Sequence, residues 1–238
     1  MKRAARLAFA LDVPTGREAL VLARRLRAAI DLVKVGKELF VREGPAIVRA
    51  LRQLDIEVFL DLKFHDIPAT VGAACASAAR LDVELLDLHA QGGSEMMLSA
   101  GRALRSTCRR EGLRRPRLLA VTVLTSLDDA DLTQVGQKGP ALDQVKRLAD
   151  LTRQAGLDGV VCSAEESAAL RAIHGPDFLL VVPGIRMAAA GDDQKRVVTP
   201  AEAVRRGASY IVIGRPITQA KNPGQAIDEI ARHMAEAA

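Results

Sequence analysis

The stretch EVFLDLKFHDIPAT, residues 57–70, holds the features on which the fold and the chemistry of this chain depend. It begins with a continuous apolar run, which is typical of a parallel strand covered on both faces. Asp61 and Lys63 stand at the end of that run, and because they are two residues apart on a strand, their side chains should point to the same side. Asp66 follows at the start of the next expected helix. The stretch therefore predicts a carboxylate and an ammonium group side by side at the end of a strand.

Seven further apolar runs are spread along the 238 residues, with helical segments between them. The eight expected strands are Leu7–Asp12, Leu32–Gly36, Glu57–Leu62, Glu84–His89, Leu118–Leu124, Gly159–Cys162, Phe178–Val182 and Tyr210–Gly214. The helical stretches include Arg17–Ala29, Glu38–Leu54, Asp143–Ala155 and Ala164–Ile173, and helix-start signals stand at Thr15, Asp66, Ser94, Ser163 and Thr199. This α/β pattern predicts a (β/α)8 TIM barrel better than an open doubly wound sheet. No linker divides the chain, so residues 1–238 are expected to form one domain.

Composition narrows the class of protein further. The net charge of +5 is carried by scattered groups such as Arg109–Arg117, without interleaved aromatic residues, so we expect no nucleic-acid partner. Three widely spaced cysteines (Cys75, Cys108 and Cys162) predict neither disulfides nor a zinc site and fit a reducing compartment. The apolar start of the chain is interrupted by Asp12 and Pro14, as a signal peptide would not be, and no run approaches a membrane span. We therefore expect a cytoplasmic protein without a membrane partner.

In a TIM barrel the chemistry takes place at the carboxyl ends of the strands and in the loops that follow them. The residues expected there are unusually polar: Asp12, Lys34, Asp61, Lys63, His89, Thr125, the run Pro183-Gly184-Ile185-Arg186, and Gly214-Arg215. Lys34, Asp61, Lys63 and Asp66 are expected to form an alternating network in which each charge holds the next and the carboxylates stay ionised. On the residues alone, a structural ladder of ion pairs without chemistry remains the alternative to this interpretation.

The segment 61–70 closely resembles the signature Asp-x-Lys-x-x-Asp-Ile-Pro-x-Thr of the orotidine 5′-phosphate decarboxylases. The resemblance extends over the whole chain, through Phe9-Ala10-Leu11-Asp12, Val33-Lys34-Val35-Gly36, Leu88-His89-Ala90, Gly92-Gly93, Leu124-Thr125-Ser126, Val182-Pro183-Gly184-Ile185-Arg186, Asp193-Gln194 and Ile213-Gly214-Arg215-Pro216. One departure is Ala69, where many members of the family have Asn.

The resemblance implies decarboxylation of orotidine 5′-phosphate to UMP, the last step of de novo pyrimidine nucleotide synthesis, by a homodimer that needs no cofactor and no metal. It implies that Lys63 gives a proton to C6 of the pyrimidine and that Asp61 lies against the departing CO2 group. Asp12 and Lys34 resemble the groups that bind the ribose hydroxyls, with Lys34 also part of the catalytic network. Asp66, Ile67 and Thr70 resemble residues that reach the substrate of the other subunit, so the active sites are expected to be shared.

The remaining contacts implied by the resemblance divide between the two ends of the substrate. The phosphate contacts are Arg186, Gln194, Gly214 and Arg215, and an arginine suits a phosphate because it donates two parallel hydrogen bonds. The pyrimidine is expected to contact the hydroxyl pair Thr125 and Ser126, and Pro183 belongs to the same set of substrate contacts.

Two other functions share part of this pattern. Hexulose-phosphate synthases and ketogulonate-phosphate decarboxylases share Asp-x-Lys-x-x-Asp but lack the following Ile-Pro and need Mg²⁺, so activity in the presence of EDTA separates them. A non-catalytic phosphate- or nucleic-acid-binding barrel would reveal itself by the salt dependence of DNA binding. The four histidines show no metal-binding pairing, and His89 is expected to be a hydrogen-bonded residue at the barrel mouth. Dinucleotide, Walker and serine-hydrolase motifs are absent from the sequence.

Overall fold

A computed structural model describes residues 5–187 and 198–237 of the chain. Its strands form a closed barrel in chain order, each strand lies parallel to the next, and β1 pairs with β8. The strands are β1 (Arg6–Ala10), β2 (Leu32–Gly36), β3 (Val58–Phe64), β4 (Leu85–His89), β5 (Arg117–Val121), β6 (Gly159–Val161), β7 (Leu179–Val182) and β8 (Tyr210–Ile213). Each lies where the sequence predicts a strand, so the (β/α)8 fold is confirmed.

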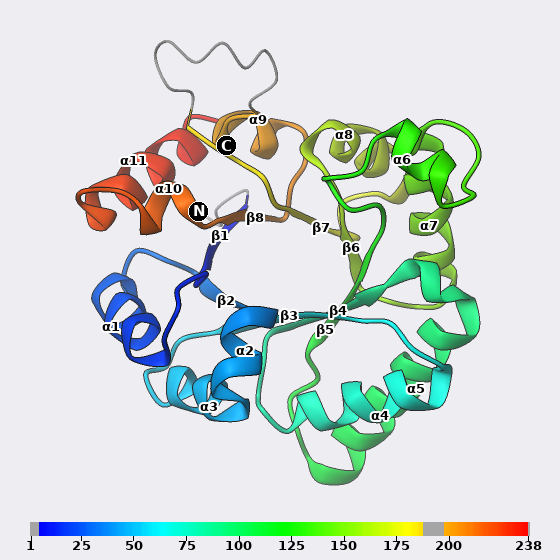
Figure 1. The fold of residues 1–238 in the computed structure, drawn as a ribbon, viewed down its shortest axis with the longest axis horizontal. Coiled ribbons are helices and arrows are strands. Elements are labelled where there is room, and N and C mark those ends of the chain that lie inside the picture. Colours follow the sequence, from blue (N-terminus) through cyan, green and yellow to red (C-terminus); the bar gives the residue numbers. More distant parts are fainter. Residues whose placement is uncertain (1–4, 188–197, 238) are drawn as a thin grey trace.

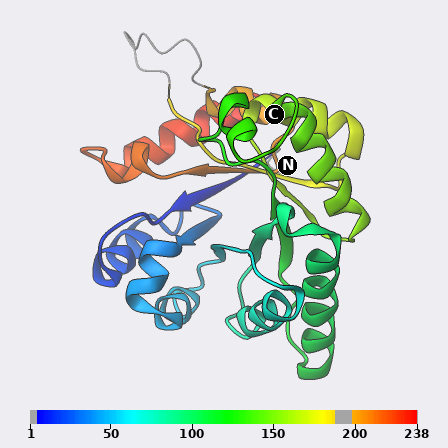
Figure 2. The same ribbon diagram turned by 45° about the vertical axis from the view of Figure 1, so that its right-hand side comes forward.

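The helices surround the strands on all sides (Figure 1). They are α1 (Gly16–Leu26), α2 (Lys37–Glu43), α3 (Pro45–Arg52), α4 (Pro68–Ala79), the short 3-10 helix η1 (Ala90–Gly92), α5 (Gly93–Glu111), α6 (Asp129–Gln134), α7 (Ala141–Gln154), α8 (Ala164–His174), α9 (Pro200–Arg205), α10 (Arg215–Thr218) and α11 (Pro223–Ala235). The helices α4 and α5 lie side by side on the outside of the barrel, as Figures 1 and 2 both show.

Three of the expected helix starts are correct and two are displaced. Thr15 caps α1, and Ser163 and Thr199 form capping boxes at α8 and α9. The starts expected at Asp66 and Ser94 are wrong by a residue or two: α4 begins at Pro68 after Ile67, and α5 begins at Gly93. The reason at α4 is that proline fits the first helical turn, where its missing N–H is not needed.

The single helix expected over Glu38–Leu54 is wrong, because the structure divides this segment into α2 and α3. Gly44 adopts a φ of +63°, which a residue with a side chain rarely takes, and Pro45 begins the second helix. The Gly-Pro pair in the sequence is an ordinary helix stop followed by a helix start, so the break could have been predicted.

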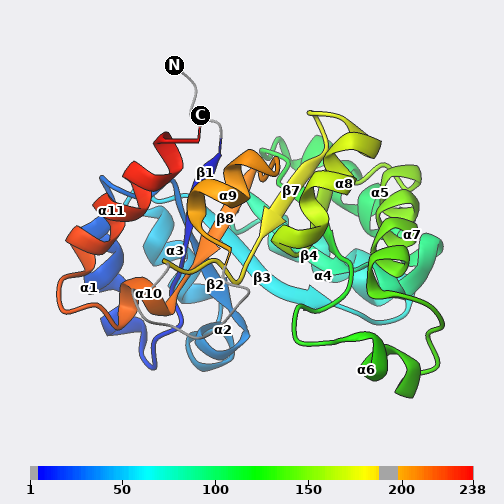
Figure 3. The same cartoon turned by 90° about the horizontal axis from the view of Figure 1, so that it is seen from above.

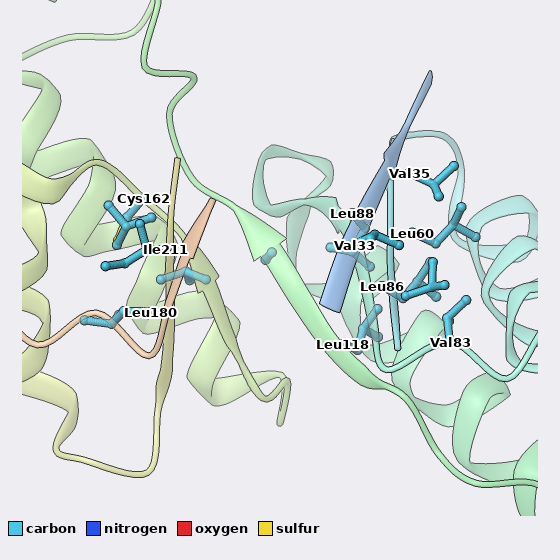
Figure 4. Close-up of a cluster of buried hydrophobic side chains, with 14 of the residues drawn as sticks. Val33, Val35, Leu60, Val83, Leu86, Leu88, Leu118, Cys162, Leu180 and Ile211 are labelled. Atoms are coloured by element: carbon cyan, nitrogen blue, oxygen red, sulfur yellow. The ribbon is translucent and has the colours of Figure 1, made fainter. Parts of the chain in front are cut away.

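Two groups of apolar side chains stabilise the barrel. One fills its interior and consists of small residues such as Ala8 and Ala10 together with larger ones such as Phe59 and Tyr210. The other lies between the strands and the helices, and the close-up in Figure 4 shows part of it, including Leu60, Leu86 and Leu88. Because side chains alternate along a strand, Leu86 and Leu88 point outward to the helices while Leu85 and Asp87 point into the barrel. A charged group at an inward position therefore has to be explained by the site.

The loops that follow the strands gather at one end of the barrel. In Figure 3 this end carries α2, α6 and α10, and the beginning of β1 lies at the opposite end. The elements that follow β2, β5 and β8 are α2, α6 and α10, which identifies this end as the mouth formed by the carboxyl ends of the strands. The candidate site residues of the sequence follow the same strands.

The arginines at residues 109–117 are placed differently from expectation. Scattered basic groups in a sequence are typical of exposed helical faces, but α5 ends at Glu111, and Arg114 and Arg115 lie beyond it. Arg114 forms ion pairs with Glu57, Asp82 and Glu84, and Arg115 pairs with Asp158. Neighbouring carboxylates therefore offset part of the positive charge of this group.

The three cysteines and the helices bear on the expectations for disulfides and membrane segments. Cys75, Cys108 and Cys162 are buried free thiols. Among residues 5–187 and 198–237, no helix has both the length and the apolar character needed to cross a membrane.

Close packing of β6 against β7 predicts a stability effect at Gly159. A Cβ added at this position would lie 2.2 Å from the backbone oxygen of Leu179, and a backbone atom cannot move away easily. Gly159→Ala should therefore lower the free energy of unfolding by about 1–3 kcal/mol, as overpacking usually does. Urea unfolding measures the effect. The matched control is Gly224→Ala in α11, where the nearest atom lies at 3.5 Å, and equal stability loss in both variants would contradict the prediction.

Candidate active site

Four charged side chains form a continuous chain at the mouth of the barrel. Lys34 Nζ lies 3.1 Å from Asp12 Oδ1 and 3.4 Å from Asp61 Oδ2. The other oxygen of Asp61 accepts a hydrogen bond from Lys63 Nζ. Negative and positive groups thus alternate along the series Asp12, Lys34, Asp61 and Lys63, referred to below as the charge chain.

The pleat of the strands places the middle of the charge chain inside the barrel. Leu32 and Phe59 belong to the interior apolar cluster, and Lys34 and Asp61 follow each of them by two residues on the same strand. They therefore point inward above that cluster. Lys34 is 8% exposed and so is Asp61, so both charges have lost most of their water and depend on each other.

Lys63 reaches Asp61 by a route that the sequence did not reveal. A regular strand was expected to put both side chains on one side, but β3 is irregular at this point. Its pairing with β4 passes from Leu60 opposite Leu86 to Phe64 opposite Leu88, and Lys63 has a φ of +52°. A positive φ is uncommon for a residue with a side chain and is often found at functional sites. Lys63 and Asp61 are in contact as expected, but an irregularity in β3 brings them together and not the regular alternation of a strand.

The charge chain also determines the protonation of its buried members. Burial by itself would lower the pKa of Lys34, but the charges of Asp61 and Asp12 outweigh it and raise that pKa. Burial would raise the pKa of Asp61, but a hydrogen bond with Asp87 and the charges of Lys34 and Lys63 lower it below its usual value. Both groups are therefore charged at neutral pH, and the site presents an anion between two cations.

A cavity of about 190 Å³ opens beside the charge chain. Lys34, Asp61 and Lys63 form its polar side, and Thr125 and Pro183 line it from the loops after β5 and β7. The remaining lining is largely apolar: Phe59, Val121, Val123, Leu124, Val161, Cys162 and Val212. A flat, partly apolar group with one polar edge suits this space. Ligand pockets are usually about 300–1,000 Å³, so a molecule the size of a nucleotide would extend beyond the cavity.

A second pocket, of about 340 Å³, is lined by residues that follow β7 and β8. Arg186 follows Pro183 by three residues, Arg215 follows Val212 by three, and both guanidinium groups line this pocket together with Met187, Pro216, Gln219 and Ala220. Two arginines in an open pocket favour an anion such as a phosphate. The two pockets therefore suit a ligand with a flat ring at one end and a phosphate at the other.

Gly214 connects the arginine pocket to the charge chain. A Cβ at Gly214 would lie 3.1 Å from the Cβ of Ala10 and 3.4 Å from Asp12 Oδ2. A side chain would therefore crowd the end of β1, and glycine permits the backbone before Arg215 to pass close by. Gln194, the remaining expected phosphate contact, lies outside the described residues.

Other expected site residues lie on the rim, away from the charge chain. Asp66, Ile67 and Thr70 are exposed, and Asp66 Oδ1 accepts a hydrogen bond from the N–H of Ile67 at 2.6 Å. Among the described residues Asp66 forms no ion pair with Lys34 or Lys63, so Asp12 and not Asp66 supplies the outer carboxylate of the charge chain within one chain. Ser126 is exposed, and unlike Thr125 it does not line the cavity.

Two histidines stand close to the charge chain. The rings of His65 and His89 lie 5.5 Å apart. Burial, with the nearby charges of His65, Lys37 and Lys63, lowers the pKa of His89 to about 4, so its ring is neutral at pH 7. Within the described ranges, no three His, Cys, Asp or Glu side chains are grouped as a metal site would require.

Sequence reasoning missed one charged residue of the site, Asp87. It lies on β4, is 0% exposed, and accepts a hydrogen bond from the N–H of Lys63 at 2.8 Å. The sequence does contain a sign of it, because Asp87 is an acidic residue between leucines in the expected strand Glu84–His89. The resemblance to the family gives Asp87 no role, since the signature motif lies in residues 61–70. Nothing in the sequence distinguishes Phe59, Val161 and Val212 as part of the cavity lining, because inward-pointing residues of a barrel are commonly apolar.

Comparison with known proteins places this geometry in a family. Residues 5–230 match the family model described as "Orotidine 5'-phosphate decarboxylase / HUMPS family". The chain belongs to this family. An orotidine 5′-phosphate decarboxylase of Alcanivorax borkumensis is 50% identical over 227 residues, which is 95% of this chain and 96% of that protein. The enzyme of the same name from Nitrosococcus oceani is 52% identical over 226 residues, covering 94% of this chain and 95% of the relative.

Solved structures of the decarboxylase family agree with the barrel. The structure of orotidine 5′-phosphate decarboxylase from Lactobacillus acidophilus superimposes with a TM-score of 0.83 at 38% identity, covering 97% of this chain and 99% of that one. The structure of the same enzyme from Pyrococcus horikoshii has a TM-score of 0.77 at 22% identity. At this identity the likeness supports the fold and nothing further.

Proposed function

We propose that this decarboxylase-family chain converts orotidine 5′-phosphate to UMP and CO2, the last step of de novo pyrimidine nucleotide synthesis. One observation carries the proposal: the charge chain lines a cavity that suits a pyrimidine, and Arg186 and Arg215 line an adjoining pocket that suits a phosphate. Membership of the family and the names of relatives about 50% identical support it.

Catalysis is assigned to Asp61 and Lys63, which are in direct contact. Held ionised by its neighbours, Asp61 would stand against the substrate carboxylate and disfavour the bound ground state. When the bond from C6 to the carboxylate breaks, its electron pair stays on C6, where the ammonium of Lys63 stabilises the negative charge and then supplies the proton. The interaction with Lys63 grows as charge develops, so it favours the transition state over the substrate.

The other contacts are assigned by position. Lys34 and Asp12 would hold the ribose hydroxyls, with Lys34 also fixing Asp61. Thr125 and Pro183 would contact the pyrimidine from the cavity wall, and Ser126 would join them from the rim. The phosphate is assigned to Arg186, Gln194, Gly214 and Arg215. No cofactor, metal, membrane or nucleic acid enters the proposed reaction, and we place the enzyme, as one domain over residues 1–238, in the cytoplasm.

The reaction itself is tested by adding purified, EDTA-treated protein to orotidine 5′-phosphate and following absorbance. Steady loss of the orotate chromophore, unchanged by EDTA, is expected. Loss of the chromophore only when Mg²⁺ is restored would contradict a metal-free reaction, and no loss under either condition would contradict the proposal.

Lys63→Ala should abolish turnover while leaving the fold intact, because Lys63 is the ammonium group assigned to protonate C6. An interaction made mainly in the transition state lowers kcat and kcat/KM together. The matched control is Lys146→Ala on α7, a lysine that forms no ion pair with any other residue in the described part of the chain. Activity of Lys63→Ala within a few-fold of the parent would remove Lys63 from this role.

Arg215→Ala should lower kcat/KM for orotidine 5′-phosphate by about two or more orders of magnitude, because binding energy at the remote phosphate helps to form the reactive complex. The parent and the variant should be equally poor on orotidine, which lacks the phosphate. Arg232→Ala, an exposed arginine on α11, is the control. If Arg215→Ala lost a further large factor on orotidine, the phosphate assignment would be wrong.

We also propose a homodimer whose active sites are shared. Support comes from the rim after β3, where Ile67 is 66% exposed between the exposed residues Asp66 and Thr70. A large apolar side chain so exposed suits a covered interface. In such a dimer, Asp66, Ile67 and Thr70 of one subunit would complete the site of the other.

Shared sites predict complementation between two inactive variants. Lys63→Ala and Asp66→Ala are unfolded together and refolded as a mixture, so that about half of the dimers are mixed. In each mixed dimer one site collects both defects and the other is wholly wild type, so roughly a quarter of all sites should recover activity. A mixture of Lys63→Ala with Arg215→Ala should not recover, because both residues serve their own chain. A first mixture that remains inactive despite proven subunit exchange would contradict shared sites.

A further inference from the structure

Asp87 is the most deeply buried charged residue of the site, and the proposed mechanism gives it no role. It lies on β4 with 0% exposure, in a strand whose other residues before His89 are leucines. Leu85, two residues earlier, belongs to the interior cluster and pairs with Phe59, so Asp87 also points into the barrel, at the level of Asp61. A buried carboxyl group is costly unless its oxygens are paired or it is neutral.

One oxygen of Asp87 secures the irregular part of β3. Oδ1 accepts a hydrogen bond from the N–H of Lys63 at 2.8 Å, at the point where Lys63 has a φ of +52°. The regular pairing of β3 with β4 is interrupted there, so the carboxyl oxygen takes the place of a strand partner for this N–H. The backbone conformation that aims Lys63 toward Asp61 therefore depends on Asp87.

The other oxygen of Asp87 is not satisfied as an ionised group. Oδ2 is buried, accepts no hydrogen bond within the described part of the chain, and lies 4.0 Å from Lys63 Nζ. Burial raises the pKa of Asp87, and its close neighbour, the carboxyl group of Asp61, raises it further. Two carboxyl groups can share a hydrogen bond only if one of them carries a proton.

The surrounding charges determine which of the two groups carries that proton. Lys34 and Lys63 both pair with Asp61 and favour its ionised form. Around Asp87, the paired residue on β5 is the uncharged Leu119, and from α4 the buried Cys75 thiol has a pKa raised to about 12 by burial and by Asp87. Burial and then the charge of Asp61 raise the pKa of Asp87 well above its usual value.

We propose that Asp87 is a positioning residue that is protonated in the folded protein, donating from Oδ2 to the Asp61 carboxylate while Oδ1 holds the backbone of Lys63. The proton on Asp87 is independent of the proposed function, and only its effect on catalysis rests on that function. With Asp87 neutral, the Lys63 ammonium pairs with one carboxylate, and no second negative charge lies beside the proposed position of the substrate carboxylate.

The proton is tested directly with Asp87→Asn, because an asparagine can accept from Lys63 and donate to Asp61 as a protonated carboxyl group does. At pH 7 the infrared spectrum of the parent should contain a band of a protonated carboxyl group that is missing from Asp87→Asn. Identical spectra in this region would overturn the proposal, whether or not the protein decarboxylates orotidine 5′-phosphate.

Stability provides a second, independent measurement. The pKa of Asp87 is raised on folding, so above the unfolded value the unfolded chain loses a proton that the folded chain keeps, and rising pH favours unfolding. The unfolding constant of the parent relative to Asp87→Asn should rise by about tenfold per pH unit above pH 5 until the folded pKa is passed. A ratio that stays constant from pH 5 to 8 would show that Asp87 is ionised in the folded protein and would contradict the proposal.

The positioning role is tested by comparing Asp87→Asn with Asp87→Ala. The alanine variant leaves the N–H of Lys63 unpaired and should lower kcat roughly 10- to 100-fold with little change in KM, as a small misplacement of a reacting group does. Asp87→Asn should recover most of that loss. If the asparagine variant is as poor as the alanine variant while the infrared and stability results hold, Asp87 is protonated but does not position Lys63.

Discussion

The ion pair between Lys34 and Asp61 is the interaction on which the rest of the site depends. Both groups lie inside the barrel with 8% exposure, and neither could remain charged there alone. The pair fixes the carboxylate that holds Lys63, and through Lys34 it connects Asp12 to Asp61 and Lys63. Breaking such a pair leaves an uncompensated buried charge, which accounts for the close spacing of opposite charges along the whole chain.

Strand β3 contains an uncommon backbone conformation, and β4 supplies the side chain that supports it. A regular β3 would have paired fully with β4 and left no backbone conformation to aim Lys63. The bulge gives up strand pairing at that point, and the positive φ of Lys63 is tolerated because a buried side chain of β4 binds its N–H. The charged end of β3 is therefore irregular, while Phe59 and Leu60 in the apolar layers keep the regular pairing with β4.

The barrel was predictable from the sequence because continuous apolar runs and helical segments alternate along the chain. Lys34, Asp61 and Lys63 were predictable as neighbours because they end adjacent strands. The bulge at Lys63 was not, since a strand is regular by default and nothing in residues 57–70 marks the change of register. Asp66 was expected to join the charge network of its own chain, but the exposed turn before α4 carries it outward, and Asp12 takes that position.

The seam where β1 pairs with β8 has a consequence for how the protein is made. Asp12 lies near the start of the chain and Arg215 near its end, and Gly214 brings these two segments together. At about 5–20 residues per second, a ribosome completes Arg215 several seconds or more after Lys63. Until then the barrel cannot close, and the charges at the future mouth remain hydrated. The nascent chain therefore buries these groups only when the last strand arrives, so no half-formed intermediate has to hold an unpaired charge in an apolar core.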